Sequence, residues 1–178
     1  MNTNNSHLTK EEINSIVTGL QKLTPGFLPL AIFLELARLC VIATVEMAPI
    51  FIAENKEIFV LMTKRFDDDP FWPGKYHLPG SVIRPTDEPA DSLKDALGRV
   101  IKEELAGVEV AEDPVFVKYM FRQVPPRNKE MTLLHYVILK DKISDYEFFN
   151  VKELPEPEMV PTHIDLIKEI AEVIKNKI

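Results

Sequence analysis

Two adjacent carboxylates, Glu103 and Glu104, lie near the end of the segment GRVIKEELAG, residues 98–107. Apolar residues recur at helical spacing through this segment and the residues before it, which predicts a helix. On that helix Val100, Glu103 and Glu104 are neighbours at three and four residues apart. Two carboxylates this close repel each other unless a cation lies between them, and Mg2+ takes oxygen ligands. The alternative is a solvated helix face on which Glu103 pairs with a basic neighbour such as Lys102.

The composition fits one globular domain of ordinary size. The chain has 178 residues, of which 46% are hydrophobic and 28% charged, and a disordered chain would be less hydrophobic. The net charge of −7 gives no basis for a nucleic-acid-binding surface, and a single cysteine excludes an internal disulfide. The apolar run 27–53 contains Glu35, Arg38 and Glu46, which argues against a membrane span. The polar N-terminus lacks the apolar centre of a secretory signal, so we expect a cytoplasmic protein.

Two helices are predicted near the N-terminus. The first begins with a capping box, in which Thr9 is the N-cap and Glu12 lies three residues further on. The second covers about residues 29–39, with a proline in its first turn. We expect residues 1–39 to form a helical appendage packed on a main domain of residues 40–178. The apolar faces of these helices could form a homodimer surface.

From residue 40 onward the pattern changes to strands, with one helix in the middle and one at the end. The middle helix is predicted over about residues 92–105 with Asp91 as its N-cap, and the last helix within residues 161–178 with Thr162 as its cap. The strands are predicted within six segments, namely 40–52, 57–65, 76–83, 114–124, 131–139 and 146–151. This order predicts an α/β or α+β sandwich with a mixed sheet.

The region around the two glutamates resembles the signature of the Nudix hydrolase family. That signature is a glycine, five residues, Glu, seven residues, Arg-Glu, an apolar residue, any residue, Glu-Glu, any residue, Gly and an apolar residue. Here LPGS resembles its start, DSLKDALGR has seven residues between Asp91 and Arg99, and IKEE fits its end. The similarity covers roughly residues 40–160. It implies a Nudix-type α/β/α sandwich with a mixed sheet, preceded by the two N-terminal helices.

Four features depart from the signature. Its second glycine is Ser81, the loop before Asp91 is longer by four residues, and one extra residue precedes Gly107. The glutamate that should follow Arg99 is Val100, so one carboxylate of the signature is missing.

The resemblance implies a metal site and a reaction. Glu103 and Glu104 would be catalytic residues that bind Mg2+ or Mn2+ together with the carbonyl of Gly80. Asp91 and Arg99 would form a structural ion pair that fixes the loop to the helix. In this family the metals bridge the diphosphate of the substrate and activate a water molecule. The implied function is Mg2+-dependent hydrolysis of a small-molecule substrate in which a nucleoside diphosphate is linked to another moiety.

The valine at position 100 leaves the general base open. The candidates outside the signature are Glu130, Asp145, Glu147 and His163, of which we predict Glu147. Two other functions stay open. One is hydrolysis at the sugar carbon, as in the GDP-mannose hydrolases of this family, which also lack this glutamate. The other is a catalytically degenerate domain that binds a nucleotide-sugar as a sensor.

Two residues are predicted to bind the substrate. Arg65 ends the second predicted strand, where the family often has an arginine near the substrate, and His77 lies on the strand that enters the site. Three aromatic residues between or beside them, Phe71, Trp72 and Tyr76, could stack on a base or pack in the core.

Overall fold

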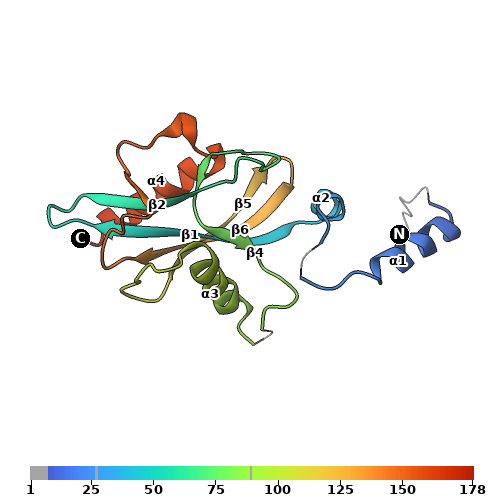
Figure 1. The fold of residues 1–178 in the computed structure, drawn as a ribbon. Helices are drawn as coiled ribbons and strands as arrows, with labels where there is room; N and C mark the ends of the chain where they lie inside the picture. The colour runs from blue at the N-terminus through green and yellow to red at the C-terminus, as the bar shows by residue number, and fades with distance from the viewer. Residues whose placement is uncertain (1–7, 27, 89) are drawn as a thin grey trace.

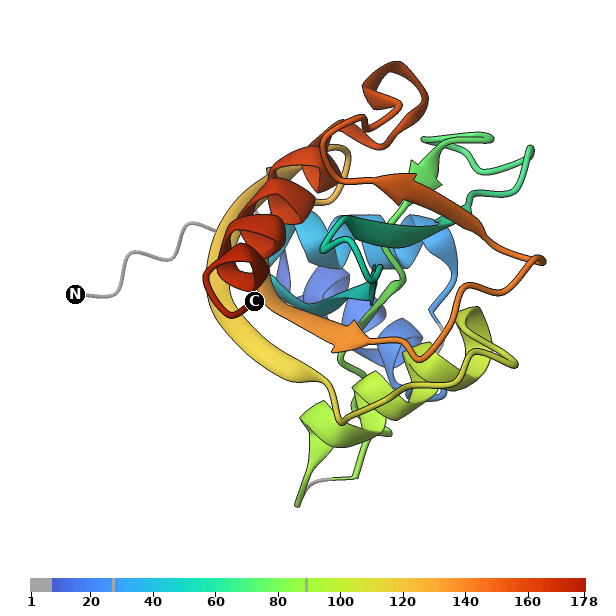
Figure 2. The same ribbon diagram turned by 90° about the vertical axis from the view of Figure 1, so that its left-hand side faces the viewer.

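The structure is a computed structural model that describes residues 8–26, 28–88 and 90–178. Within these residues, seven strands form one mixed sheet with a helix on each face (Figures 1 and 2). The strands are β1 (Ile42–Ile52), β2 (Ile58–Lys64), β3 (Tyr76–His77), β4 (Gly80–Val82), β5 (Val115–Val124), β6 (Asn128–Ile138) and β7 (Glu147–Asn150). The covering helices are α3 (Ser92–Glu104) and α4 (Pro161–Lys175). The expected α/β/α sandwich with a mixed sheet is confirmed.

The sheet divides along its central strand, β1. The strand order is β3-β2-β1-β6-β5, with β4 also paired to β1 and β7 paired to β2. β1 is parallel to β6 and antiparallel to both β2 and β4. Residues 50–52 of β1 pair with β2, whereas residues 44–46 pair with β4. Between these two pairings, the N–H of Met47 donates to the carbonyl of Pro79. The turn that leads into β4 therefore lies where the sheet divides.

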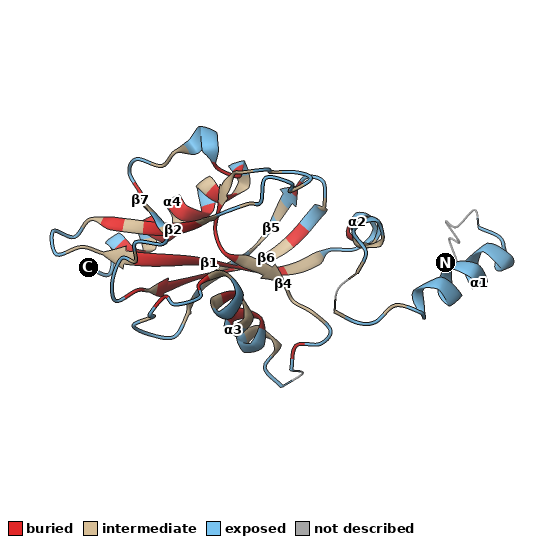
Figure 3. Ribbon diagram, in the orientation of Figure 1, coloured by how far each residue is buried: buried red, intermediate tan, exposed pale blue. Residues whose placement is uncertain are grey.

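Alternate residues of β1 enter two separate cores, as expected for a strand covered on both faces. Val45 and Met47 belong to the core under α3, while Ala48 and Ile50 belong to the core under α4. Figure 3 shows this continuous burial as the red centre of β1. By the same alternation Glu46, which is 5% exposed, faces α4.

Helix α3 has the boundaries and the buried face that its periodicity predicts. The side chain of Asp91 accepts a hydrogen bond from the N–H of Lys94 at 3.2 Å, which confirms the predicted N-cap. Ala96, Leu97 and Val100 are the buried residues of the helix. Val100 is 1% exposed and packs in the core under α3. Its side chain therefore contributes apolar packing.

Helix α4 begins earlier than predicted. Its first residue is Pro161 and its N-cap is Val160, which makes no side-chain capping bond, so the prediction of Thr162 as the cap was wrong. Proline suits the first helical position because its φ is already helical and its missing N–H has no helical partner there. Its buried apolar face consists of Leu166, Ile167, Ile170, Ala171 and Ile174.

The two N-terminal helices differ in how they meet the rest of the chain. The capping box of α1 (Lys10–Leu20) is present, with reciprocal bonds between Thr9 and Glu12. However, α1 has no buried residue, and Figure 3 shows it exposed and away from the sheet. α2 (Leu30–Leu39) lies beside the sheet and buries Ala37. The expected packing on the main domain thus applies to α2 alone, and the homodimer stays a prediction. Among the described helices, none is long and apolar enough to cross a membrane.

The ion pair that fixes the loop to α3 uses a different carboxylate from the one predicted. The Arg99 guanidinium donates to both carboxylate oxygens of Asp87, at 2.8 and 2.9 Å, and to the Ser81 hydroxyl at 2.6 Å. The eight residues from Asp91 to Arg99 span about 12 Å of helix, which is too far for a direct contact. The loop instead folds back and buries Asp87. Burial alone would raise the pKa of Asp87, but the hydrogen bonds from Arg99 and from the N–H of Arg84 lower it overall.

This assignment predicts which variants lose stability. Arg99→Ala leaves a buried carboxylate unpaired, so it is expected to lower the free energy of unfolding by about 3 kcal/mol, or Tm by about 6–12 °C. Asp87→Asn is expected to behave similarly. Asp91→Asn is the matched control, because asparagine caps a helix as well as aspartate does. Urea and thermal unfolding measure all three. A large loss in Asp91→Asn together with a small loss in Asp87→Asn would restore the originally predicted pair.

Candidate functional site

The two adjacent glutamates at the end of α3 differ in their surroundings. Glu104 is half-buried, and its Oε1 accepts a hydrogen bond from the N–H of Gly80 at 3.1 Å. Burial raises the pKa of Glu104 to about 7, although the bond from Gly80 acts in the opposite direction. Glu103 is exposed to solvent. The helix therefore points one carboxylate at the turn before β4 and leaves the other beside it in water.

Gly80 is the meeting point of the site, and the structure explains why it is glycine. A Cβ atom here would lie 2.3 Å from Oε2 of Glu46 and 2.8 Å from the carbonyl oxygen of Val45. Real Cβ atoms essentially never approach other atoms so closely. Because Gly80 pairs with Glu46 across β1 and β4, the absence of a side chain makes room for the Glu46 carboxylate.

Glu46 is a residue of the candidate site that sequence reasoning missed. Its Oε1 lies 3.4 Å from the guanidinium of Arg122 and 3.9 Å from Nε2 of His163. Its Oε2 is buried and has no hydrogen-bond partner among the described residues. Burial raises the pKa of Glu46 to about 8, against the opposing effects of Arg122 and Arg127. The available signal was a carboxylate at the centre of an apolar strand, which the sequence analysis used only as an argument against a membrane span.

Two buried histidines fix the turn that carries Gly80. The carbonyl of Leu78 accepts a hydrogen bond from Nδ1 of His77 at 2.7 Å. The backbone N–H of Leu78 donates to Nδ1 of His163 at 2.9 Å. Burial lowers the pKa of His77 to about 4 and that of His163 well below its usual value, so both rings are neutral near pH 7. Because Nδ1 of neutral His163 accepts a bond, its proton lies on Nε2. The ring has no free nitrogen to act as a general base.

The predicted substrate residue His77 is also held by the protein through its second nitrogen. Its Nε2 lies 3.1 Å from the hydroxyl of Thr63, which in turn lies 3.4 Å from Oε2 of Glu104. A hydroxyl has one proton, so Thr63 can donate a hydrogen bond to His77 or to Glu104 but not to both at once. The Oε2 oxygen of Glu104 is consequently less well satisfied than its Oε1, which agrees with its raised pKa.

A small polar chamber lies against the Gly80 turn. Its volume is about 30 Å3, which is enough to hold a water molecule. It is bordered by Glu46, Gly80, His77, His163, Arg65 and Arg127. The predicted substrate residue Arg65 thus reaches this chamber. Glu130 lies behind Arg127, which contacts it at 2.8 Å, and is 0% exposed.

The remaining predicted bases lie elsewhere. Glu147 pairs with Met62 across β2 and β7, and cross-strand partners point to the same face of a sheet. Met62 belongs to the core under α4, which is the side of the sheet that Glu46 also faces. Neither Asp145 nor Glu147 borders the chamber, and Tyr146 between them donates a hydrogen bond to the carbonyl of Ala106 at 2.9 Å, just beyond the end of α3. The structure therefore brings neither Asp145 nor Glu147 to the chamber.

The donors around Gly80 fit a hard divalent cation. They are the carboxylates of Glu104 and Glu46 and the backbone carbonyl of Gly80, with the exposed Glu103 next to Glu104 on the helix, and all of these groups are oxygen ligands. Within the described residues, no three His, Cys, Asp or Glu side chains are arranged as a complete metal site. Mg2+ does not need such a cage, because it usually binds one or two carboxylates and completes its shell with water and substrate phosphates. The orphaned Oε2 of Glu46 is a further oxygen that a nearby cation would stabilise in its charged form.

Comparison with known proteins gives one consistent result. The sequence matches no protein-family model and no curated protein. Among solved structures, a mutT/nudix family protein from Listeria innocua is similar over 76% of this chain and 95% of its own, at 17% identity and a TM-score of 0.57. The NUDIX domain of Shewanella oneidensis NrtR, complexed with ADP ribose, is similar over 94% of this chain and 99% of its own, at 15% identity and a TM-score of 0.53. The Ap4A hydrolase of C. elegans is similar over 76% of this chain and 99% of its own, at 8% identity and a TM-score of 0.51.

At these identities the similarity concerns the fold. It confirms the fold that the resemblance in the sequence implies. The chain has the Nudix hydrolase fold.

Proposed function

We propose that this protein hydrolyses a nucleoside diphosphate linked to another moiety, with Mg2+ or Mn2+ held by Glu103, Glu104 and the carbonyl of Gly80. The observation that carries the proposal is the contact between Glu104 and the N–H of Gly80 at 3.1 Å. It joins the carboxylate end of α3 to the turn before β4, so that the three groups belong to one site. The oxygen donors there are of the kind that Mg2+ requires.

The substrate class is supported by two structural neighbours. The NrtR domain is complexed with ADP ribose, which is a nucleoside diphosphate linked to a sugar, and the C. elegans protein is an Ap4A hydrolase. Both compounds contain a nucleoside joined through a chain of phosphates to a second group. Arg65 and Arg127 border the chamber at Gly80, and guanidinium groups bind phosphates through paired hydrogen bonds.

The chain's own residues divide the work of such a reaction. When bound, the cation would neutralise charge on the diphosphate and make water easier to deprotonate. Arg65 and Arg127 would orient the phosphates at the chamber. We assign the proton of the attacking water to Oε2 of Glu46, because this oxygen is unpartnered among the described residues and borders a chamber that can hold a water molecule. His77 and His163 hold the turn in place and move no proton, since their nitrogens are engaged within the protein.

A second function is favoured by one observation. Val100 lies in the apolar core, so α3 offers no carboxylate at position 100 beside Glu103 and Glu104. A domain that binds a nucleotide derivative without cleaving it would have no need of one. The NrtR domain, which is similar over 94% of this chain, is complexed with ADP ribose. Stabilisation by ADP-ribose or other nucleotides without product formation over a broad panel would support this binding function.

Metal binding is predicted to depend on the pair at the end of α3. For the wild-type protein, Mg2+ or Mn2+ at a hundredfold excess over Kd is expected to add about 2.7 kcal/mol to the free energy of unfolding. The double variant Glu103→Gln, Glu104→Gln is expected to lose this metal-induced gain and keep its fold. The control is Asp67→Asn, Asp68→Asn, which removes the same charge from an exposed loop. Thermal unfolding with and without metal measures both. An undiminished gain in the glutamate variant would refute the site.

The general base is predicted to be Glu46. Glu46→Gln keeps the side-chain shape and is expected to lower turnover of ADP-ribose, or of the best substrate in a nucleotide panel, by about 10² to 10⁴. The metal-induced rise in Tm should persist, because the residues at the end of α3 still bind the cation. Glu147→Gln, the base predicted from the sequence, is expected to keep full turnover. The turnover of each variant is measured by chromatography of the reaction products.

A complementary variant tests the same assignment from the other side. Val100→Glu places a carboxylate in the core rather than in the chamber, so it is expected to lower Tm and not to raise turnover. Full activity in Glu46→Gln would contradict the assignment. So would a sharp rise in turnover for a folded Val100→Glu.

A further inference from the structure

A second cavity opens directly beside the polar chamber. Its volume is about 290 Å3, close to the lower limit of about 300 Å3 typical of small-molecule sites. It shares Arg65 and Arg127 with the chamber. Most of its other walls are apolar or aromatic, and they are Leu30, Phe33, Phe71, Trp72, Pro125 and Pro126. The polar chamber and the largely apolar cavity therefore adjoin at two guanidinium groups.

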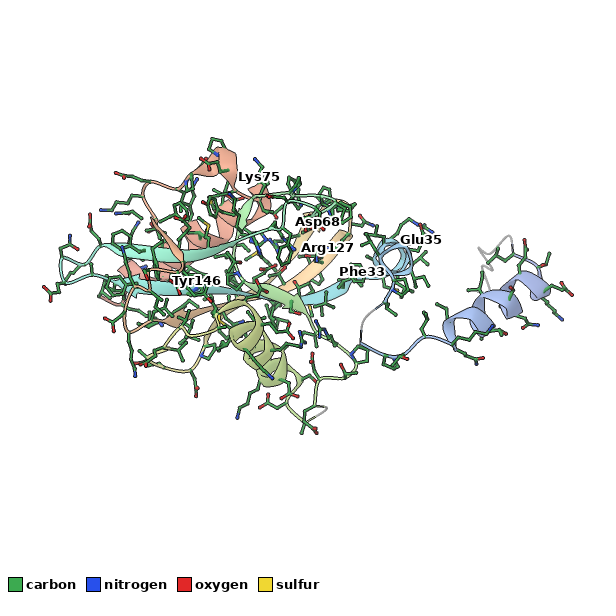
Figure 4. The ribbon with its side chains drawn as sticks, in the orientation of Figure 1. Phe33, Glu35, Asp68, Lys75, Arg127 and Tyr146 are labelled. Carbon is green, nitrogen blue, oxygen red and sulfur yellow. The ribbon has the colours of Figure 1, made fainter. Side chains whose placement is uncertain are left out.

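Part of this cavity comes from the N-terminal appendage. Phe33 lies on α2, outside the sandwich itself, and is half-buried. Figure 4 shows Phe33 on the side of the sheet where Arg127 lies. Phe71 and Trp72, which also border the cavity, lie in the loop between β2 and β3. An element that the sandwich does not need for its own cores thus closes one wall of the space beside the chamber.

The aromatic loop and Arg65 are held together by one carboxylate. Asp69 accepts hydrogen bonds from the backbone N–H groups of Phe71 and Trp72 at 2.9 and 2.8 Å, and it pairs with Arg65 at 3.5 Å. Burial alone would raise the pKa of Asp69, but the bonds from Trp72 and Phe71 and the charge of Arg65 lower it overall. Asp69 is therefore ionised at neutral pH and links the loop that carries Phe71 and Trp72 to the guanidinium of Arg65. Such a site is ordered before any ligand arrives.

Arg65 and Arg127, which border both spaces, can each still bind an anionic group of a ligand. Nε of Arg65 is buried and has no hydrogen-bond partner among the described residues. Arg127 keeps its side chain 25% exposed while it contacts Glu130. A buried donor without a partner is costly in a folded protein and is expected to gain one when the site is filled. An anionic group between two arginines would supply it.

We propose that this cavity binds the base of the substrate, with the base lying between Trp72 and Phe33 while Arg65 and Arg127 hold the adjoining phosphates. The proposal rests on the function proposed above and names its specificity subsite. A nucleobase is planar and largely apolar on its faces, which suits aromatic walls. Only one ribose separates a base from its phosphates. A base in the apolar cavity would therefore place its phosphates close to Arg65 and Arg127, which border both spaces.

The single tryptophan of the chain gives a direct test, because Trp72 is the only source of indole fluorescence. The full-length protein is titrated in EDTA with ADP-ribose and GDP-mannose, and with inorganic diphosphate as the probe without a base. We expect saturable quenching by the nucleotides and none by diphosphate. Phe33→Ala is expected to raise Kd by about 10- to 100-fold, and Phe33→Tyr, which keeps the ring, to restore binding. Phe66→Ala is the matched control, since Phe66 is 83% exposed and does not border the cavity.

The outcomes separate this subsite from the reaction. Turnover of a nucleotide substrate with no change in KM for Phe33→Ala and no response of Trp72 would overturn the subsite and leave the hydrolase intact. Quenching with the expected dependence on Phe33, but no product with any metal, would support the subsite and refute the reaction. Calorimetric titration detects nucleotide binding independently of Trp72. Nucleotide binding of equal strength in wild type and Phe33→Ala would also overturn the subsite.

Discussion

The close approach of two carboxylates to the backbone of Gly80 is the constraint on which the site depends. Glu104 reaches its N–H from α3, and Glu46 fills the space that a Cβ atom would occupy. Both contacts depend on the division of the sheet along β1, because residues 44–46 pair with β4 instead of β2 and so place Glu46 opposite Gly80. The histidines on either side of Leu78 then hold this chain in position. The fold thus brings charge from two layers to one residue.

Burial in this arrangement has a cost, and that cost is informative. Glu46 and Glu104 both have raised pKa values because burial disfavours their charged forms. The arginines nearby offset only part of this effect. A site that collects such groups is suited to a ligand that brings positive charge, and a divalent cation is the simplest one. Val100 fits the same account, since its apolar side chain completes the core under α3 while Glu46 places a carboxylate near Gly80 from β1.

The sequence predicted best what depends on periodicity and local capping. The boundaries of α3, its Asp91 cap and the succession of strands along the chain follow from neighbours in the sequence, although the single strand predicted over residues 76–83 is two strands, β3 and β4. The partner of Arg99 could not, because Asp87 reaches it through a loop whose path is set by tertiary contacts. Glu46 was visible as a lone carboxylate in an apolar strand, but its meaning depends on the pairing with Gly80. Glu147, the base predicted from the sequence, is exposed and does not border the chamber.

The central claim is that Glu104 and the Gly80 turn together form a cation site, and the most direct measurement is a crystal structure with Mn2+ located by its anomalous scattering. The account predicts one or more peaks in contact with the Glu104 carboxylate and the Gly80 carbonyl, with Glu103 or Glu46 as a neighbour. The same crystals grown from Glu103→Gln, Glu104→Gln protein should lose those peaks. Anomalous density only at exposed acidic loops such as residues 67–69, with none at Gly80 under saturating Mn2+, would contradict the account.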